Sequence, residues 1–178
     1  EHGFVHGDIK PDNLVFDPTK RQFAMIDFGG LTKQSKNDVS GEAMGKVLSD
    51  GYVVPSNHRQ QGSRSDRRYG QEADLYAFGV SMLELSLPAD AVVKLKAAGD
   101  KGDRDSLKQT LSDLRQNHGF APGTMEDLAI QLMELSVDQN QPLIGRLNEQ
   151  PSALKAIWEK IQTHPVVAEA QAAKPPMR

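Results

Sequence analysis

The sequence predicts a mainly α-helical α+β fold, a helical bundle in which short strands carry the loops of a functional site. Two observations lead to this prediction. Three short apolar runs, separated by turn-forming and charged residues, stand near the start of the chain in the manner of short strands. A long apolar segment near the middle, and the amphipathic segments after it, have the length and period of helices.

The strands are expected at residues 4–5, 14–16 and 23–26, where apolar side chains stand between turn residues. Residues 29–72 follow, rich in Gly, Ser, Asn, Lys and Arg and without a sustained period. So long an irregular segment inside a compact domain is usually either functional or disordered.

A buried central helix is expected at residues 74–85, because the stretch DLYAFGVSMLEL is apolar nearly all round. Further helices are expected at residues 89–98, 104–117, 125–136 and 151–163. Thr124, with Asp127 three positions later, forms a helix start signal ahead of the third of these. Trp158 is expected in the core, and residues 166–178 are expected to form a flexible tail.

The composition excludes several classes of protein. Of the 178 residues 38% are hydrophobic and 25% charged, and the net charge of −3 argues against nucleic acid as a partner, because phosphate binders carry a basic excess. No apolar run approaches the roughly 20 residues that span a bilayer, so no membrane span is expected. Cysteine is absent, which excludes disulfides and thiolate metal sites and fits a reducing, cytoplasmic compartment.

Two short motifs concentrate the chemically capable side chains: HGDIKPDN at residues 6–13 and DFG at 27–29. Phosphoryl transfer requires metal ions held against the phosphates and a carboxylate that orients the attacking hydroxyl. Asn13 and Asp27 offer the hard oxygen ligands that suit Mg²⁺. Asp8 can accept the proton of the acceptor hydroxyl, while Lys10 can neutralise charge on the transferred group.

These motifs resemble the catalytic loop (H-R-D-x-x-x-x-N) and the D-F-G metal loop of protein kinases, at their usual separation. The resemblance implies that Asp8 is the catalytic base and that Lys10 is the lysine typical of Ser/Thr kinases. It implies that Asn13 and Asp27 hold the metal of a bound Mg-ATP, or Mn-ATP.

The resemblance continues downstream of the metal loop. SDGYVVPS (residues 49–56) resembles the end of an activation segment, and YGQEADLYAFGV (69–80) resembles the family's Y-x-x-x-x-D-x-W-S-x-G. Ser49 is then expected to hydrogen-bond the catalytic aspartate and lysine, while Asp74 is expected to bind the catalytic-loop backbone. The remaining supporting residues are implied to be His6, Phe28 and Gly29. The implied architecture is a kinase C-terminal lobe.

Two departures from the family pattern concern regulation. Gly7 replaces the arginine that usually receives an activation-loop phosphate, so we expect an enzyme of the non-RD type, constitutively active or activated by a partner. Ser56 replaces the glutamate of A-P-E, whose usual partner is a late arginine, here Arg146. How the activation segment is anchored is therefore open.

No Gly-rich phosphate loop, strand lysine or partner glutamate precedes the catalytic loop in this chain. We therefore expect residues 1–165 to be the C-lobe portion of a longer kinase, with its own N-lobe as a necessary partner. The isolated chain is expected to transfer phosphate poorly or not at all.

The predicted function is transfer of the γ-phosphoryl of Mg-ATP to a Ser or Thr hydroxyl of a protein substrate. The HGD loop and irregular activation segment also resemble kinases that pathogenic bacteria inject into host cells, which would place the enzyme in host cytosol beside a host activating protein. Two alternatives stay open: a pseudokinase that serves as an interaction module, and a small-molecule kinase of the aminoglycoside or choline type.

Overall fold

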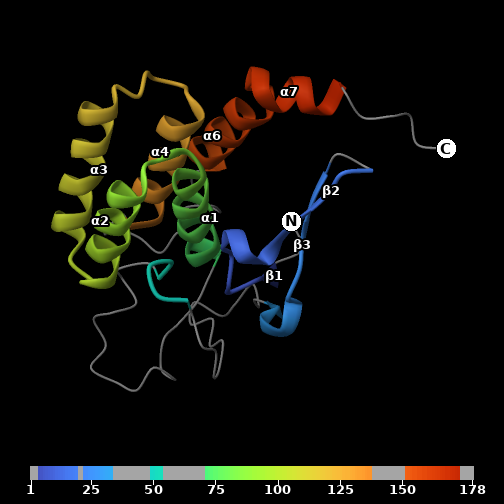
Figure 1. Ribbon diagram of the computed structural model, residues 1–178, viewed down its shortest axis with the longest axis horizontal. Helices are drawn as coiled ribbons and strands as arrows, with labels where there is room; N and C mark the ends of the chain where they lie inside the picture. The colour runs from blue at the N-terminus through green and yellow to red at the C-terminus, as the bar shows by residue number, and fades with distance from the viewer. Residues whose placement is uncertain (1–3, 20–21, 34–48, 54–70, 138–150, 173–178) are drawn as a thin grey trace.

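The structure, a computed structural model, describes residues 4–19, 22–33, 49–53, 71–137 and 151–172. It has a helical body and a smaller strand-rich part beside it (Figure 1). The strands are β1 (Phe4–Val5), β2 (Leu14–Asp17), β3 (Gln22–Met25) and β4 (Thr32–Lys33). The helices are α1 (Gln71–Ser86), α2 (Ala89–Asp100), α3 (Arg104–His118), α4 (Met125–Val137), α6 (Pro151–Thr163) and α7 (Pro165–Ala172).

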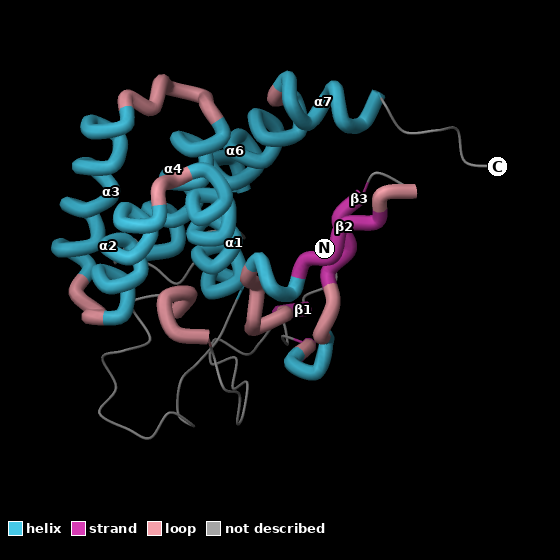
Figure 2. Tube along the Cα trace, viewed as in Figure 1, coloured by secondary structure: helices cyan, strands magenta, loops and turns pink. Residues whose placement is uncertain are grey.

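The strands form two antiparallel pairs, which carry the polar loops between them (Figure 2). β2 and β3 form a hairpin in which Leu14 faces Met25 and Phe16 faces Phe23. β1 pairs with β4, a strand that the sequence did not predict because its two residues lie inside the irregular stretch. The β1–β4 pair joins the start of the HGD loop to the chain just after the DFG motif.

Helix α1 is the centre of the helical body, as its apolar sequence predicts. Tyr76, Val80 and Leu83 on this helix are completely buried. Gly79 lets α4 approach closely, because a Cβ at this position would lie 2.9 Å from the carbonyl oxygen of Ala129 and 2.5 Å from Cγ of Met133. The core therefore depends on a small residue where the two helices cross.

Helices α2 and α4 pack against α1, and α3 packs against α2 and α4, all through apolar faces. The predicted start of α4 is confirmed, because the amide of Asp127 donates to Oγ1 of Thr124 at 3.3 Å and the helix begins at Met125. Helix α3 is joined to α4 by charge: Nε of Arg115 donates to Oδ1 of Asp127 at 3.1 Å, and Nη1 donates to Oε1 of Glu134 at 2.7 Å.

The C-terminal helices differ from expectation in two ways. Ile157 and Ile161 of α6 are buried, but Trp158 is 48% exposed, so its predicted place in the core is wrong. Successive helical residues are rotated by about 100°, and the isoleucine face leaves Trp158 to one side. We expected residues 166–178 to form a flexible tail, whereas Pro165–Ala172 forms α7, which begins with the proline favoured in a first helical turn.

Among the described residues, no helix is both long enough and apolar enough to cross a membrane.

Candidate active site

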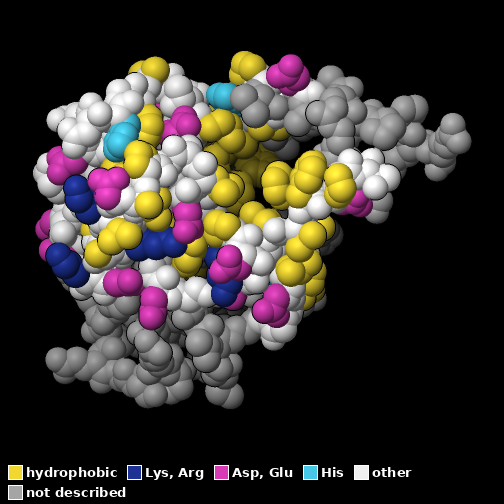
Figure 3. Space-filling view, in the orientation of Figure 1, with side chains coloured by type: hydrophobic (Ala, Val, Ile, Leu, Met, Phe, Trp, Pro, Cys, Tyr) yellow, Lys and Arg dark blue, Asp and Glu magenta, His cyan; other side chains and the backbone are white. Residues whose placement is uncertain are grey.

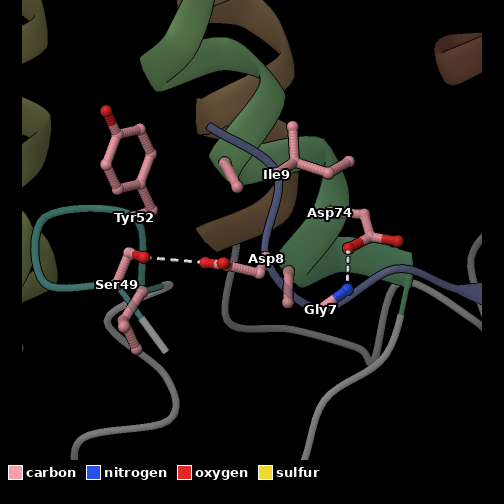
Figure 4. A pocket seen from close by; sticks show the side chains of 9 residues that line it. Gly7, Asp8, Ile9, Ser49, Tyr52 and Asp74 are labelled. Carbon is pink, nitrogen blue, oxygen red and sulfur yellow. Dashed lines mark hydrogen bonds between the residues drawn. The ribbon is translucent and has the colours of Figure 1, made fainter. Parts of the chain in front are cut away.

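The loop that follows β1 is held against the start of α1 by Asp74. Its carboxylate accepts the backbone amide of His6 at 2.7 Å. It also accepts the backbone amide of Gly7 at 2.9 Å (Figure 4). A carboxylate bound by two amides fixes the backbone on both sides of one peptide. The position of the next residue, Asp8, is therefore set by a helix that is anchored in the core of the body.

Three side chains converge on Asp8. Oγ of Ser49 donates to Oδ1 of Asp8 at 2.8 Å (Figure 4), while Nζ of Lys10 lies 2.9 Å from Oδ2. Nδ2 of Asn13 donates to the backbone oxygen of Asp8 at 2.8 Å and to Oδ2 at 3.1 Å. Lys10 also donates to Ser49 at 2.6 Å, so the lysine, serine and aspartate form a closed triangle.

These contacts keep Asp8 ionised. Burial by itself would raise the pKa of its carboxyl. Hydrogen bonds from Lys10 and Ser49, the charge of Lys10 and the bond from Asn13 outweigh this effect, and the pKa of Asp8 falls below its ordinary value. The group therefore acts as a hydrogen-bond acceptor at neutral pH.

The DFG motif lies next to this cluster through the backbone. The amide of Ile26 donates to the carbonyl of Asn13 at 2.9 Å, which places Asp27 one residue from that contact. Asp27 has a left-handed conformation with φ of 59°, and its Oδ1 accepts the amide of Gly29 at 3.3 Å. Aspartate tolerates this conformation better than most residues. The carboxylate of Asp27 is exposed.

Phe28 brings the two motifs into side-chain contact. Its ring meets that of His6 edge to face, with centroids 5.4 Å apart. His6 is buried, and its Nδ1 accepts the amide of Asp8 at 3.3 Å. The orientation of the His6 ring is thus coupled both to the DFG motif and to the backbone of Asp8.

The donor set near the two motifs fits Mg²⁺. Among the described residues Asn13 uses Nδ2 for both hydrogen bonds of its side chain, which leaves Oδ1 as a neutral oxygen ligand, and Asp27 adds an exposed carboxylate. No cluster of three His, Cys, Asp or Glu side chains occurs in the described residues. Two protein oxygens with the remaining positions taken by phosphate and water is the usual manner of binding Mg²⁺ beside a nucleotide.

A small pocket lies where the HGD loop, the segment of residues 49–53 and the start of α1 meet (Figure 4). Its lining residues are Gly7, Asp8, Ile9, Ser49, Tyr52, Val53, Ala73, Asp74 and Ala77. The pocket therefore opens beside the serine and aspartate that hydrogen-bond each other.

The residues that hold segment 49–53 from the other side were not singled out in the sequence. Tyr52 donates a short hydrogen bond to Glu84 of α1 and accepts one from Lys96 of α2 at 2.9 Å, and the amide of Gly51 donates to Asp100 at 2.8 Å. The sequence does offer an indication for Glu84, since an acidic residue near the end of a nearly apolar helix suggests that its side chain has a polar partner. Lys96 and Asp100 looked like solvated charges of an amphipathic helix. Ser56 and Arg146 lie outside the described residues.

Comparison with known proteins agrees with the arrangement of these motifs. The family described as "Protein kinase domain" matches residues 1–141. The serine/threonine-protein kinase Kist of Mus musculus is 32% identical over 88 residues, which are 47% of this chain and 20% of Kist. Rho-associated protein kinase 1 of Homo sapiens is 33% identical over 83 residues, 47% of this chain and 6% of that kinase. The chain thus spans a small part of these relatives, and by its match over residues 1–141 it belongs to the protein kinase domain family.

Proposed function

We propose that this chain carries the catalytic and metal-binding loops of a Ser/Thr protein kinase, which transfers the γ-phosphoryl of Mg-ATP to a hydroxyl of a protein substrate. The observation that carries the proposal is the convergence of Lys10, Asn13 and Ser49 on the carboxylate of Asp8. Protein kinases of the Ser/Thr class are among its relatives, which supports the same reaction.

Asp8 orients the acceptor hydroxyl. Its lowered pKa means that it is a weak base, so it holds the hydroxyl by accepting a hydrogen bond and takes the proton only as the new phosphate ester forms. Ser49 fixes the rotation of the carboxylate by occupying Oδ1. This positioning converts the attack of the hydroxyl on the phosphorus into an effectively unimolecular event.

Lys10, Asn13 and Asp27 serve the phosphate side of the site. The ammonium of Lys10 bridges Asp8 and Ser49 and offsets charge on the transferred group. Oδ1 of Asn13 and the carboxylate of Asp27 would hold Mg²⁺, which neutralises the phosphate oxygens when bound. His6, Phe28, Gly29 and Asp74 are supporting residues that keep both loops in position.

We propose further that residues 1–165 are the C-lobe portion of a longer kinase, called the parent protein below. Phe16 and Phe23 of the β2–β3 hairpin are 51% and 68% exposed, and their rings lie 5.1 Å apart. Figure 3 shows hydrophobic side chains gathered over this hairpin and in the hollow beside it. An N-lobe that binds ATP would cover such a surface, which supports the expectation that the chain alone transfers phosphate poorly.

The regulatory part of the proposal rests on Gly7. This residue offers its amide to Asp74 and has no side chain to receive an activation-loop phosphate. We therefore propose a non-RD kinase that does not depend on such a phosphate. The similarity to injected bacterial kinases stays a prediction, because the relatives reported above are mammalian enzymes.

The test is phosphate transfer from labelled ATP by the parent protein, followed by phosphoamino-acid analysis, with Asp27→Ala as the inactive variant. Asp90→Ala, an exposed carboxylate in the first turn of α2, is the matched control. We expect label on Ser or Thr that is lost in Asp27→Ala and retained in the control. The activity should fall by about a hundredfold or more, the usual cost of removing one electrostatic contact to a transition state.

Other outcomes would contradict the proposal. No transfer to any protein by a folded parent protein with Mg²⁺ would favour a pseudokinase. Label on an aminoglycoside or choline, and on no protein, would favour a small-molecule kinase. Near-normal transfer by Asp27→Ala would show that the metal loop is wrongly assigned.

A further inference from the structure

One face of α2 seats the segment of residues 49–53. Lys96, Gly99 and Asp100 are spaced i, i+3 and i+4, so they lie on the same side of the helix. We call these three residues the α2 anchor. Each of them lies against this segment, which ends in the serine bound to Asp8.

Lys96 makes most of the side-chain interactions of the α2 anchor. Its Nζ donates to the hydroxyl of Tyr52 at 2.9 Å and to Oε1 of Glu84 at 2.7 Å, and lies 4.4 Å from the centre of the Tyr52 ring. Tyr52 in turn donates to the other carboxylate oxygen of Glu84. The three side chains therefore form a closed group that ties the segment to both α1 and α2.

Asp100 holds the backbone of the segment, and Gly99 lies beside it. Oδ1 of Asp100 accepts the amide of Gly51 at 2.8 Å. Gly51 has φ of 85°, a conformation that favours glycine, and a Cβ there would lie 2.8 Å from Cγ of Lys96. A Cβ at Gly99 would overlap the hydroxyl of Tyr76 and would lie 3.9 Å from the carbonyl oxygen of Val53, so the buried Gly99 leaves room for Tyr76 and lies beside the end of the segment.

The hydrogen bonds of the α2 anchor to this segment lie only two or three residues from Ser49. The amide of Tyr52 donates to the carbonyl of Ser49 at 3.3 Å, which closes a turn between the two. A shift of Tyr52 therefore moves the Ser49 hydroxyl, whose bonds to Asp8 and Lys10 are 2.8 and 2.6 Å long. The anchor and the reacting carboxylate are the two fixed ends of one short segment.

We propose that Lys96 and Asp100 are positioning residues. They hold Ser49 where its hydroxyl can hydrogen-bond the carboxylate of Asp8, and so keep that carboxylate oriented toward the acceptor hydroxyl. This inference rests on the proposed kinase function. It differs from a purely stabilising role for the Lys96–Glu84 ion pair, because that role would not couple α2 to the acceptor side of the reaction. Ion pairs at half-exposed positions contribute little to stability by themselves.

The experiment compares Lys96→Met, Lys96→Arg and Asp100→Ala in the parent protein, with Lys94→Met as the matched control. Lys94 is an exposed lysine on the same helix. Two quantities are measured: kcat and KM for a protein or peptide acceptor and for ATP, and hydrogen–deuterium exchange of the amides of residues 50–53. Because exchange requires no activity, it reports the anchoring separately from catalysis.

We expect Lys96→Met to lower kcat/KM for the acceptor by about tenfold or more, which is the scale of one lost charge-assisted hydrogen bond. The KM for ATP should stay within about twofold of wild type, since Asn13 and Asp27, which would hold the metal of Mg-ATP, make no hydrogen bond to Ser49 or to the α2 anchor among the described residues. Lys96→Arg should restore most of the activity. Exchange at residues 50–53 should accelerate about tenfold in Lys96→Met and in Asp100→Ala, and be unchanged in Lys94→Met.

Unchanged exchange in Lys96→Met and Asp100→Ala would overturn the inference, whatever the activity. An equal rise in KM for ATP and for the acceptor would also overturn it, because a general loss of structure affects both substrates. If the wild-type parent protein transfers no phosphate, the proposed function fails, whereas faster exchange in the two variants would still support the α2 anchor as the support of Ser49.

Discussion

The hydroxyl of Ser49 donates a hydrogen bond of 2.8 Å to Oδ1 of Asp8, although 41 positions separate the two residues in the sequence. This bond joins the loop after β1 to a segment that is otherwise held by α1 and α2. Since Lys10 donates to the same hydroxyl at 2.6 Å, the serine is shared between a carboxylate and an ammonium. The surroundings of Asp8 are therefore complete only when the loop after β1, residues 49–53 and the helices that hold them are all folded together.

Replacing Ser49 tests this link directly. Ser49→Ala removes one hydrogen bond to a carboxylate and one from an ammonium, each worth about 1.5–3 kcal/mol in such charged pairs. We expect kcat of the parent protein to fall by roughly 10- to 100-fold, because the carboxylate of Asp8 loses its fixed orientation, and the melting temperature to fall as these bonds are lost. Ser49→Thr keeps the hydroxyl and should retain most of the activity. Equal losses in the two variants would show that the hydroxyl is not the determinant.

Asp74 is expected to be the most sensitive support of the HGD loop. Its carboxylate accepts the amides of His6 and Gly7, so Asp74→Ala leaves two backbone donors without this partner. We expect a loss of stability of about 2–3 kcal/mol, measured by denaturant unfolding of the parent protein, together with a large loss of activity. Asp74→Asn keeps one acceptor oxygen and should fall between wild type and Asp74→Ala. A variant Asp74→Ala with normal stability and rate would contradict this assignment.

Much of the fold could be predicted because its helices carry a strong period. The buried helix around Tyr76 was evident from its uniformly apolar sequence, and the start of α4 from Thr124 and Asp127. The strand pair β1–β4 was missed because two residues give no alternation to read. Trp158 was misplaced since a large apolar side chain on an amphipathic helix was assigned to its buried face without regard to the angle.

Some residues of the candidate site could likewise be predicted from the sequence, and others could not. Asp8, Lys10 and Asn13 lie within six positions, so a local motif identifies them. Ser49 was reached only through resemblance to a family, because nothing in the local sequence indicates a partner so far away. Lys96 and Asp100 gave no signal at all. A charged side chain on an amphipathic helix looks the same whether it faces water or a second segment, and only the packing of α2 distinguishes the two.

Gly79 is expected to tolerate no side chain. In most helix interiors Gly→Ala stabilises a protein by about 0.5–1 kcal/mol. At Gly79 the added Cβ would meet the backbone oxygen of Ala129 at 2.9 Å, and backbone cannot move aside as a side chain can. We therefore expect Gly79→Ala to destabilise the parent protein by about 1–3 kcal/mol. The sign of the change in stability is decisive, since an increase in melting temperature would mean that α1 and α4 do not cross this closely.

Removing the hydroxyl of Tyr76, in contrast to substituting Gly79, is not expected to lower the stability of the protein. It is buried, lies against Gly99 and has no hydrogen-bond partner among the described residues. An unpaired buried hydroxyl costs about 1–3 kcal/mol. Tyr76→Phe should therefore leave stability unchanged or raise it by about 1 kcal/mol, while Tyr76→Leu, which also removes the ring, should lower it. A marked loss of stability in Tyr76→Phe would reveal a partner for the hydroxyl.

The link between α3 and α4 makes the stability of the helical body depend on pH. Burial alone would raise the pKa of Asp127. Hydrogen bonds from the amide of Gly123, from Arg115 and from Gln131 lower the pKa by more than burial raises it, so the pKa of Asp127 lies below the ordinary value. A carboxyl whose folded pKa is lowered contributes stability above its unfolded pKa of about 3.9, and this contribution is lost as pH falls through the folded pKa. The pairing should therefore stabilise the protein fully at neutral pH.

Asp127→Asn keeps the shape and removes the charge, and we expect it to lower stability by about 1 kcal/mol at pH 7. The difference from wild type should persist down to about pH 5 and shrink below about pH 4, where the carboxyl of the unfolded chain begins to take up its proton while that of the folded protein stays ionised. Melting temperatures of the parent protein across this range measure it. Asp113→Asn, an exposed carboxylate on α3, is the control and should show little difference at any pH. A difference for Asp127→Asn that stays constant down to pH 3 would mean that its charge does not hold α3 to α4.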